Sequence, residues 1–243
     1  MEVRILHMVA GSPHIVELLV ADRAPFYHML VFPAYDCTLH EFIKHGEHRL
    51  SEQIMSKICG QLVRAVCILA QHRVLHRDIK PRNVLVRESE PLAVVLSDFG
   101  SAVVLTEELA CGAVRDDVCT RGYEAPEMLW QRPYGPPSDV WSLGVVMAEA
   151  TTGCHPFGHG HTRQDLMRRI RDVCIEPGAT GVEMETIITN GDTKFRDRAT
   201  PTCFRTVRSG RHLMPILTSM LKVNVSGRAS GAWILETHAA LVK

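Results

Sequence analysis

Residues 76–83 read His76-Arg77-Asp78-Ile79-Lys80-Pro81-Arg82-Asn83, and this stretch is the most informative part of the sequence. It comes soon after a segment, 52–71, whose apolar residues recur at spacings of three and four, as on one face of a helix that Ser51 caps. Two shorter motifs follow in order, Asp98-Phe99-Gly100 and then Ala125-Pro126-Glu127. Polar motifs in this order, placed between structured segments, predict an active site to which separate turns contribute.

Together the three motifs are similar to those of the eukaryotic protein kinase family, and Lys80 resembles the serine/threonine branch of that family. The likeness continues in residues 120–127, which resemble a substrate-binding loop, and in residues 138–144, which resemble the start of the central helix of the large lobe. It covers nearly the whole chain and is weakest over 176–210.

Within the family, the chain is most similar to the cyclin-dependent and MAP kinase group, through Thr120-Arg121, Glu2-Val-Arg-Ile-Leu and Pro13-His-Ile-Val. It departs from that group at Gly122 and Glu124, where the group usually has tryptophan and arginine. The change at Glu124 reverses a charge, so the usual regulatory contacts of the group are not expected here.

The resemblance implies an α+β, protein-kinase-like fold with a mainly helical large lobe and a truncated small lobe. Residues 1–35 are expected to form the residual small lobe and hinge, and residues 36–243 the large lobe. Periodicity and turn residues predict strands at 15–21, 27–32, 83–86 and 92–96. They predict helices at 2–9, 39–45, 52–71, 139–152 (capped by Ser138), 163–174, 212–222 and 231–242.

Phosphoryl transfer needs a carboxylate that orients a hydroxyl and takes its proton, and cations that neutralise the developing charge. Asp78 is the candidate base, and Lys80 could place an ammonium group near the transferring phosphoryl group. Asn83 and Asp98 supply the oxygen ligands that Mg²⁺ prefers, with nucleotide phosphates completing its shell. The sequence therefore predicts Mg²⁺ and ATP as cofactors, with Asn83 and Asp98 as metal ligands.

By the resemblance, Asp139 holds the catalytic loop through backbone N–H groups, Arg228 pairs with Glu127, and Thr120 touches the catalytic aspartate. Arg77, next to Asp78, implies an activation segment that a phosphate or a carboxylate orders. One hypothesis is that Asp116 and Asp117 supply that carboxylate; the alternative is a solvated acidic loop.

The resemblance also assigns residues near the start of the chain. Glu2 aligns with the helix glutamate that pairs with a phosphate-gripping lysine in active kinases. Neither that lysine nor a glycine-rich loop precedes it, so a late-starting chain with a poorly held small lobe is expected. Phe32 corresponds to the gatekeeper, and the Pro33 carbonyl and the Tyr35 N–H to the adenine-binding hinge.

The 243 residues are 46% hydrophobic and 22% charged, with a formal net charge of zero, so nothing in the overall charge points to nucleic acid or an anionic membrane as partner. The eight cysteines include no Cys-x-x-Cys pair, and no signal peptide or membrane helix is expected. An intracellular location, cytoplasmic or nuclear, is therefore predicted.

The favoured function is serine/threonine phosphorylation of protein substrates, with a regulatory protein as a further partner. Two alternatives remain: a pseudokinase-like scaffold that binds protein partners without catalysis, and an unstable fragment. Four arginines on 163–174, namely Arg163, Arg168, Arg169 and Arg171, are either a solvated face or a docking site for an acidic partner.

Overall fold

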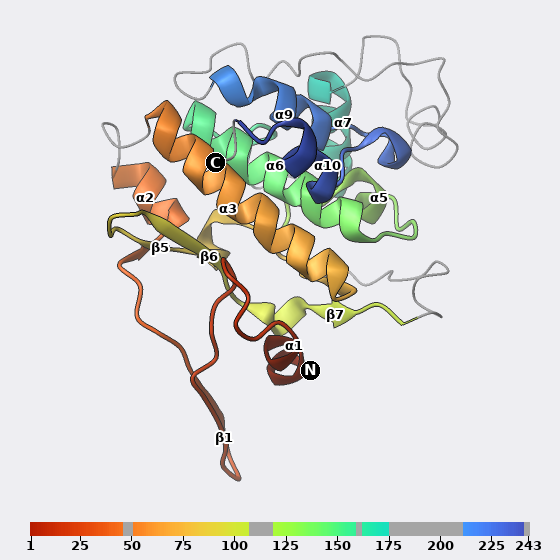
Figure 1. The fold of residues 1–243 in the computed structure, drawn as a ribbon. Helices are drawn as coiled ribbons and strands as arrows, with labels where there is room; N and C mark the ends of the chain where they lie inside the picture. Colours follow the sequence, from red (N-terminus) through yellow and green to blue (C-terminus); the bar gives the residue numbers. More distant parts are fainter. Residues whose placement is uncertain (46–50, 107–118, 159–161, 175–210, 241–243) are drawn as a thin grey trace.

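The computed structural model describes residues 1–45, 51–106, 119–158, 162–174 and 211–240 (Figure 1). Its α-helices are α1 (Glu2–Met8), α2 (Leu39–His45), α3 (Glu52–Gln71), α5 (Pro126–Leu129), α6 (Pro136–Thr152), α7 (Arg163–Cys174), α9 (Met214–Met220) and α10 (Gly231–Thr237). Its strands are β1 (Val20–Arg23), β2 (His28–Val31), β3 (Cys37–Thr38), β4 (Val74–Leu75), β5 (Val84–Arg87), β6 (Ala93–Leu96) and β7 (Val103–Val104). Short 3₁₀ turns are η1 (Pro81–Asn83), η2 (Phe99–Ser101), η4 (Arg211–Leu213) and η5 (Val225–Gly227). The predicted α+β fold class, mainly helical with few strands, is confirmed.

Helix α3 forms one side of the core. The Ser51 side chain accepts a hydrogen bond from the N–H of Ile54 at 3.3 Å, which caps the helix as predicted. One face of α3 is buried against α6, β6 and α10 (Figure 1). By length and composition α3 could cross a membrane, and it is the one such helix in the described part of the chain, but more than half of it is buried inside the domain.

Helix α6 is the central helix of the core. It is buried on nearly every side, as its apolar residues predict. The predicted start at Asp139 with Ser138 as cap is wrong: the helix begins at Pro136, after Gly135. Prolines fit the first turn of a helix because the N–H groups there have no intrahelical partner. The Ser138 hydroxyl instead donates to Glu127.

Two small antiparallel sheets contain the strands next to the motif loops. Strands β3, β5 and β6 form the larger, with Leu85 opposite Val95, and β4 pairs with β7. The turn η1 leads directly into β5, and β6 ends two residues before Asp98. Pairing of β5 with β6 thus brings residues 76–83 and the Asp98 motif to the same place.

The start of the chain is partly as expected. Helix α1 packs into the core through Ile5 and Leu6, so the prediction of a poorly held segment is wrong there. Ile15 makes only an isolated bridge to Leu96, and the first strand begins at Val20 rather than at residue 15. The turn between β1 and β2, Ala24–Tyr27, has Pro25 as its second residue, which is the position that proline favours in a β-turn. The β1–β2 hairpin projects from the body (Figure 1).

Candidate active site

Asp78 is the centre of a network of hydrogen bonds. The Lys80 ammonium lies 2.6 Å from its Oδ2 atom. The Thr120 hydroxyl donates to Oδ1 at 2.6 Å, and the Thr120 N–H donates to the same oxygen at 3.1 Å. The Lys80 Nζ atom also lies 2.8 Å from the Thr120 hydroxyl oxygen. The Asp78 carboxylate is therefore fixed in position, although it remains slightly accessible at 7% exposure.

Asn83 is held against the same carboxylate. Its Nδ2 group donates to the Asp78 carbonyl oxygen at 2.9 Å and lies 3.1 Å from Oδ2. Because both donors of the amide turn toward Asp78, its Oδ1 oxygen faces the other way and can act as a ligand.

Hydrogen bonds link Ser97, the residue before Asp98, to the backbone of Asn83. Both the N–H and the hydroxyl of Ser97 donate to the Asn83 carbonyl oxygen, at 2.8 and 3.0 Å. Asp98 itself is exposed and has a left-handed backbone, with φ of 63°. The donor set of one amide oxygen and one exposed carboxylate fits Mg²⁺, which keeps other ligands for phosphate and water. Within the described residues, no group of three or more His, Cys, Asp or Glu side chains is arranged to hold a metal.

Asp139, on α6, binds the backbone at the start of residues 76–83. Its two carboxylate oxygens accept the N–H groups of His76, at 2.8 Å, and Arg77, at 3.0 Å. Burial raises the pKa of Asp139, and these donors oppose that effect. Burial also lowers the pKa of His76, whose ring contacts the Ser97 carbonyl and packs edge-on against Phe99. A neutral His76 thus joins the two motif loops.

Arg77 turns toward the segment that follows Asp98. Its backbone is left-handed, with φ of 68°, and its Nε–H donates to the Ser101 carbonyl oxygen at 2.6 Å. Asp116 and Asp117, which the sequence suggested as its acidic partners, lie outside the described residues. The hypothesis about them therefore stays a hypothesis.

The departures at Gly122 and Glu124 have a structural reason. Gly122 has φ of +104°, and a Cβ atom there would lie 3.0 Å from Nε2 of His155, so a tryptophan does not fit. The Glu124 carboxylate is buried and accepts the N–H of Gly122 at 3.1 Å. The buried Glu124 side chain therefore stabilises the conformation of its own loop.

Sequence reasoning missed how this loop is anchored to α6. The Tyr123 hydroxyl donates to the Glu149 carboxylate at 2.7 Å, and the Ser142 hydroxyl donates to the Tyr123 carbonyl at 2.8 Å. Glu149 lies within an otherwise apolar stretch of a buried helix. A charged residue in such a place needs a partner, and that signal could have identified it.

Glu127 and Arg228 form a buried ion pair. The Arg228 Nη1 and Nη2 groups donate to the two Glu127 oxygens at 2.7 and 2.9 Å. The guanidinium group also lies over the ring of Trp141, 5.1 Å from its centroid. The pair that the resemblance implied is thus present, and it is buried rather than solvated.

The hinge candidates lie on the segment between β2 and β3. Phe32 packs against the core, and Pro33 is half-buried. The Arg87 guanidinium lies 4.8 Å from the centroid of the Tyr35 ring and donates to the Ala34 carbonyl at 3.2 Å. Within the described part of the chain, neither the Pro33 carbonyl nor the Tyr35 N–H takes part in a backbone–backbone hydrogen bond.

Glu2 lies at the start of α1, which contacts η2. Its carboxylate comes close to the Asp98 motif: an atom added at Gly100 would lie 3.3 Å from an Asp98 oxygen and 3.9 Å from a Glu2 oxygen. Burial and then the Asp98 charge raise the pKa of Glu2. The structure therefore brings Glu2 to the site, as the alignment predicted, but beside another carboxylate.

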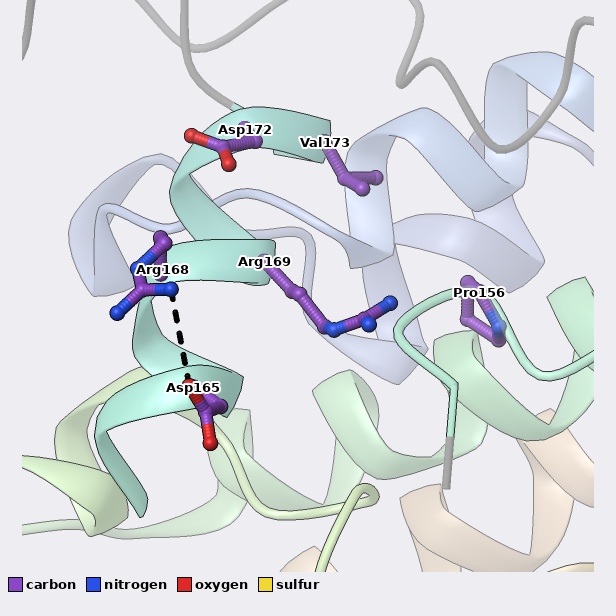
Figure 2. A pocket seen from close by; sticks show the side chains of 6 residues that line it. All are labelled: Pro156, Asp165, Arg168, Arg169, Asp172 and Val173. Atoms are coloured by element: carbon purple, nitrogen blue, oxygen red, sulfur yellow. Dashed lines mark ion pairs between the residues drawn. The ribbon is translucent and has the colours of Figure 1, made fainter. Parts of the chain in front are cut away.

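The basic face of α7 borders a pocket of about 400 Å³ that Pro156 also lines (Figure 2). Figure 2 shows Arg168 paired with Asp165, at 3.7 Å, and Arg169 extending toward Pro156. Arg171 pairs with Asp172 at 3.0 Å. Because acidic residues of the same helix balance two of the arginines, the structure favours a solvated face over a docking site.

A family model described as "Protein kinase domain" matches residues 1–239. Cyclin-dependent kinase-like 1 of Caenorhabditis elegans is 36% identical over 126 residues, which are 51% of this chain and 34% of that protein. CBL-interacting protein kinase 22 of Oryza sativa subsp. japonica is 34% identical over 180 residues, 71% of this chain and 39% of that protein.

A third relative is the phosphorylase b kinase gamma catalytic chain, liver/testis isoform, of Mus musculus. It is 33% identical over 184 residues, which are 70% of this chain and 41% of that protein. The chain thus spans between about a third and two fifths of the length of the curated relatives it matches.

Proposed function

Because the chain belongs to the protein kinase domain family, we propose that it transfers the γ-phosphoryl group of ATP to serine and threonine hydroxyls of protein substrates. The observation that carries this proposal is the Asp78 carboxylate, held at once by Lys80, Thr120 and Asn83. A base in such fixed geometry suits a reaction whose catalysis is mostly positioning and charge stabilisation.

In the proposed reaction, Asp78 orients the substrate hydroxyl and accepts its proton. The hydroxyl oxygen forms a bond to the γ-phosphorus while the bond from that phosphorus to the β–γ bridging oxygen breaks, and ADP leaves. Lys80 lies within hydrogen-bond distance of both Asp78 and Thr120, so its ammonium group can turn to the transferring phosphoryl group and stabilise its charge.

Asn83 and Asp98 would hold Mg²⁺, through the Asn83 Oδ1 oxygen and the Asp98 carboxylate. When bound, the ion neutralises charge on the phosphates. The Pro33 carbonyl and the Tyr35 N–H would bind adenine, with Phe32 as the residue before them in the chain. A regulatory protein that sets the position of α1, and with it Glu2, is part of the proposal, since α1 contacts the Asp98 motif.

Transfer of radiolabelled phosphate from ATP to a generic protein substrate tests the proposal, with Asp78→Ala as the matched control. We expect incorporation by the unmodified chain and its loss in the variant. Activity that survives Asp78→Ala would have to come from a contaminant.

A thermal shift with and without Mg-ATP tests nucleotide binding separately, with Asp98→Asn as control. We expect Mg-ATP to raise the melting temperature of the unmodified chain but not that of the variant. No transfer and no shift would reject the kinase function and favour the alternative, a scaffold that binds protein partners.

A further inference from the structure

A second pocket, of about 370 Å³, lies between α2 and the end of α6. Its lining residues are His40, Ile43, Lys44, Glu149, Gly153, Cys154, His155 and Gly158. None of them belongs to the three sequence motifs of the active site.

Two contacts connect this pocket to the active site. The Glu149 carboxylate that lines it accepts the Tyr123 hydroxyl, and Tyr123 is three residues after Thr120, which bonds Asp78. On the other side, the Arg82 guanidinium lies 3.4 Å from the His40 ring nitrogen. Arg82 is four residues after Asp78, so one short stretch of chain carries both the candidate base and the cation that contacts the pocket.

The charges around His40 are mixed, but the cations dominate. Burial lowers the pKa of His40, and Arg82 and then Lys44 lower it further, against smaller opposite effects of Glu149 and Glu41. Arg82 and Lys44 are both exposed, so their charges can reach a ligand.

The two carboxylates nearby are already engaged within the protein. Glu149 accepts a hydrogen bond from Tyr123, and Glu41 accepts the N–H and the hydroxyl of Thr38, each at 2.8 Å. A ligand at this place therefore meets two exposed cations that can turn toward it, and two carboxylates that already accept hydrogen bonds within the protein.

We propose that this pocket, with Arg82 at its rim, selects protein substrates that carry an anionic side chain, a carboxylate or a phosphate, close to the acceptor hydroxyl. This inference rests on the proposed function, because it names the substrates of the same site. Arg82 and Lys44 would then determine specificity, since neither contacts the reacting atoms.

Affinities of the full chain for labelled peptides test this. The peptides share one serine and one sequence, with Asp, Asn, Arg or phosphoserine moved one position at a time along it. In the best position we expect Asp to bind about fivefold more tightly than Asn, as an exposed ion pair allows, and phosphoserine at least as tightly as Asp.

Arg82→Gln and Lys44→Gln should each reduce the preference for Asp, whereas Arg168→Gln, a matched change on α7 away from this pocket, should leave it unchanged. Equal binding of Asp and Asn at every position, tighter binding of Arg, no binding of any peptide, or a preference that persists in both variants would overturn the inference. Phosphoserine binding without Asp binding would restrict it to phosphorylated substrates.

Alkylation of Cys154 gives a second readout that needs no catalysis. This thiol is exposed and lines the pocket, so the Asp peptide should slow its alkylation, mapped by mass spectrometry, more than the Asn peptide does. Preferential binding without phosphoryl transfer would reject the proposed function and keep the inference. Phosphoryl transfer without any preference for an anionic peptide would reject this inference and keep the proposed function.

Discussion

Arg228 and Glu127, which are 101 positions apart in the sequence, form a bidentate ion pair. Their side chains are 0% and 2% exposed. The pair joins the end of the loop at residues 120–127 to the loop before α10. Ser138 donates to Glu127, and the carbonyls of Pro137, Lys222 and Val223 accept the other Arg228 donors, so both charged groups have hydrogen-bond partners besides each other.

Arg228→Met should destabilise the fold strongly, because it leaves the Glu127 carboxylate buried without its partner. We expect a loss of about 3–5 kcal/mol in the free energy of unfolding, measured by urea denaturation. Arg168→Met, which removes an exposed ion pair, should cost less than about 1 kcal/mol. Equal losses in the two variants would contradict the role assigned to the buried pair.

The same pair predicts a dependence of stability on pH. Burial alone would raise the pKa of Glu127, but Arg228 and Ser138 lower it below its ordinary value of 4.5. Its stabilising effect is therefore complete above that value and is lost as the pH falls through the lower pKa of the folded state. Unfolding midpoints on acidification should fall more steeply for the unmodified chain than for Glu127→Gln, while Glu236→Gln, an exposed change, should follow the unmodified chain.

Thr120→Val should reduce phosphoryl transfer by about ten- to a hundredfold, because it removes the hydroxyl that bonds both Asp78 and Lys80 while keeping the shape of the side chain. Thr120→Ser keeps the hydroxyl and should retain most of the rate. The turnover number under saturating ATP is the measurement. If valine and serine gave the same rate, the hydroxyl would have no part in positioning Asp78.

Asp139→Asn should loosen the catalytic stretch, because an amide cannot accept the N–H groups of both His76 and Arg77 without turning its own donors toward one of them. We expect a loss of about 1–3 kcal/mol in stability and a lower turnover number with a nearly unchanged Michaelis constant for ATP. A normal turnover number would show that Asp139 does not position Asp78.

Gly144→Ala should destabilise the packing of α6 on α9. A Cβ atom at residue 144 would lie 2.9 Å from the Cβ atom of Met220 and about as close to Leu221. Overpacking of this kind costs about 1–3 kcal/mol. At Gly135 the nearest atom would be 3.9 Å away, so Gly135→Ala serves as the control in thermal denaturation. A melting temperature that stayed unchanged in Gly144→Ala would contradict the close packing.

Local signals in the sequence predicted some elements accurately. Helix α3 begins after Ser51 and ends at Gln71, where its cap and its period place it. The start of α6 was mispredicted, because Ser138 is a good cap by type, but its hydroxyl is used by Glu127. That use depends on a residue eleven positions away, and no local pattern contains it.

Part of the candidate site could likewise be predicted from local sequence, and part could not. The motif residues Asp78, Lys80 and Asn83 are neighbours in sequence, and they meet in the structure. The Tyr123–Glu149 bond and the Arg82–His40 contact join residues from different elements. Only the packing of α2 and α6 against the loops reveals them, so the sequence could not predict the second pocket.

Helix α6 supports each loop that would meet a substrate. Asp139 holds the stretch around Asp78, Ser142 and Glu149 hold Tyr123, and Ser138 holds Glu127. These loops have little regular structure of their own, so they depend on the helix beneath them. The consequence is cooperativity. On heating, activity and the global fold should be lost in a single transition, without a partly unfolded intermediate that remains active.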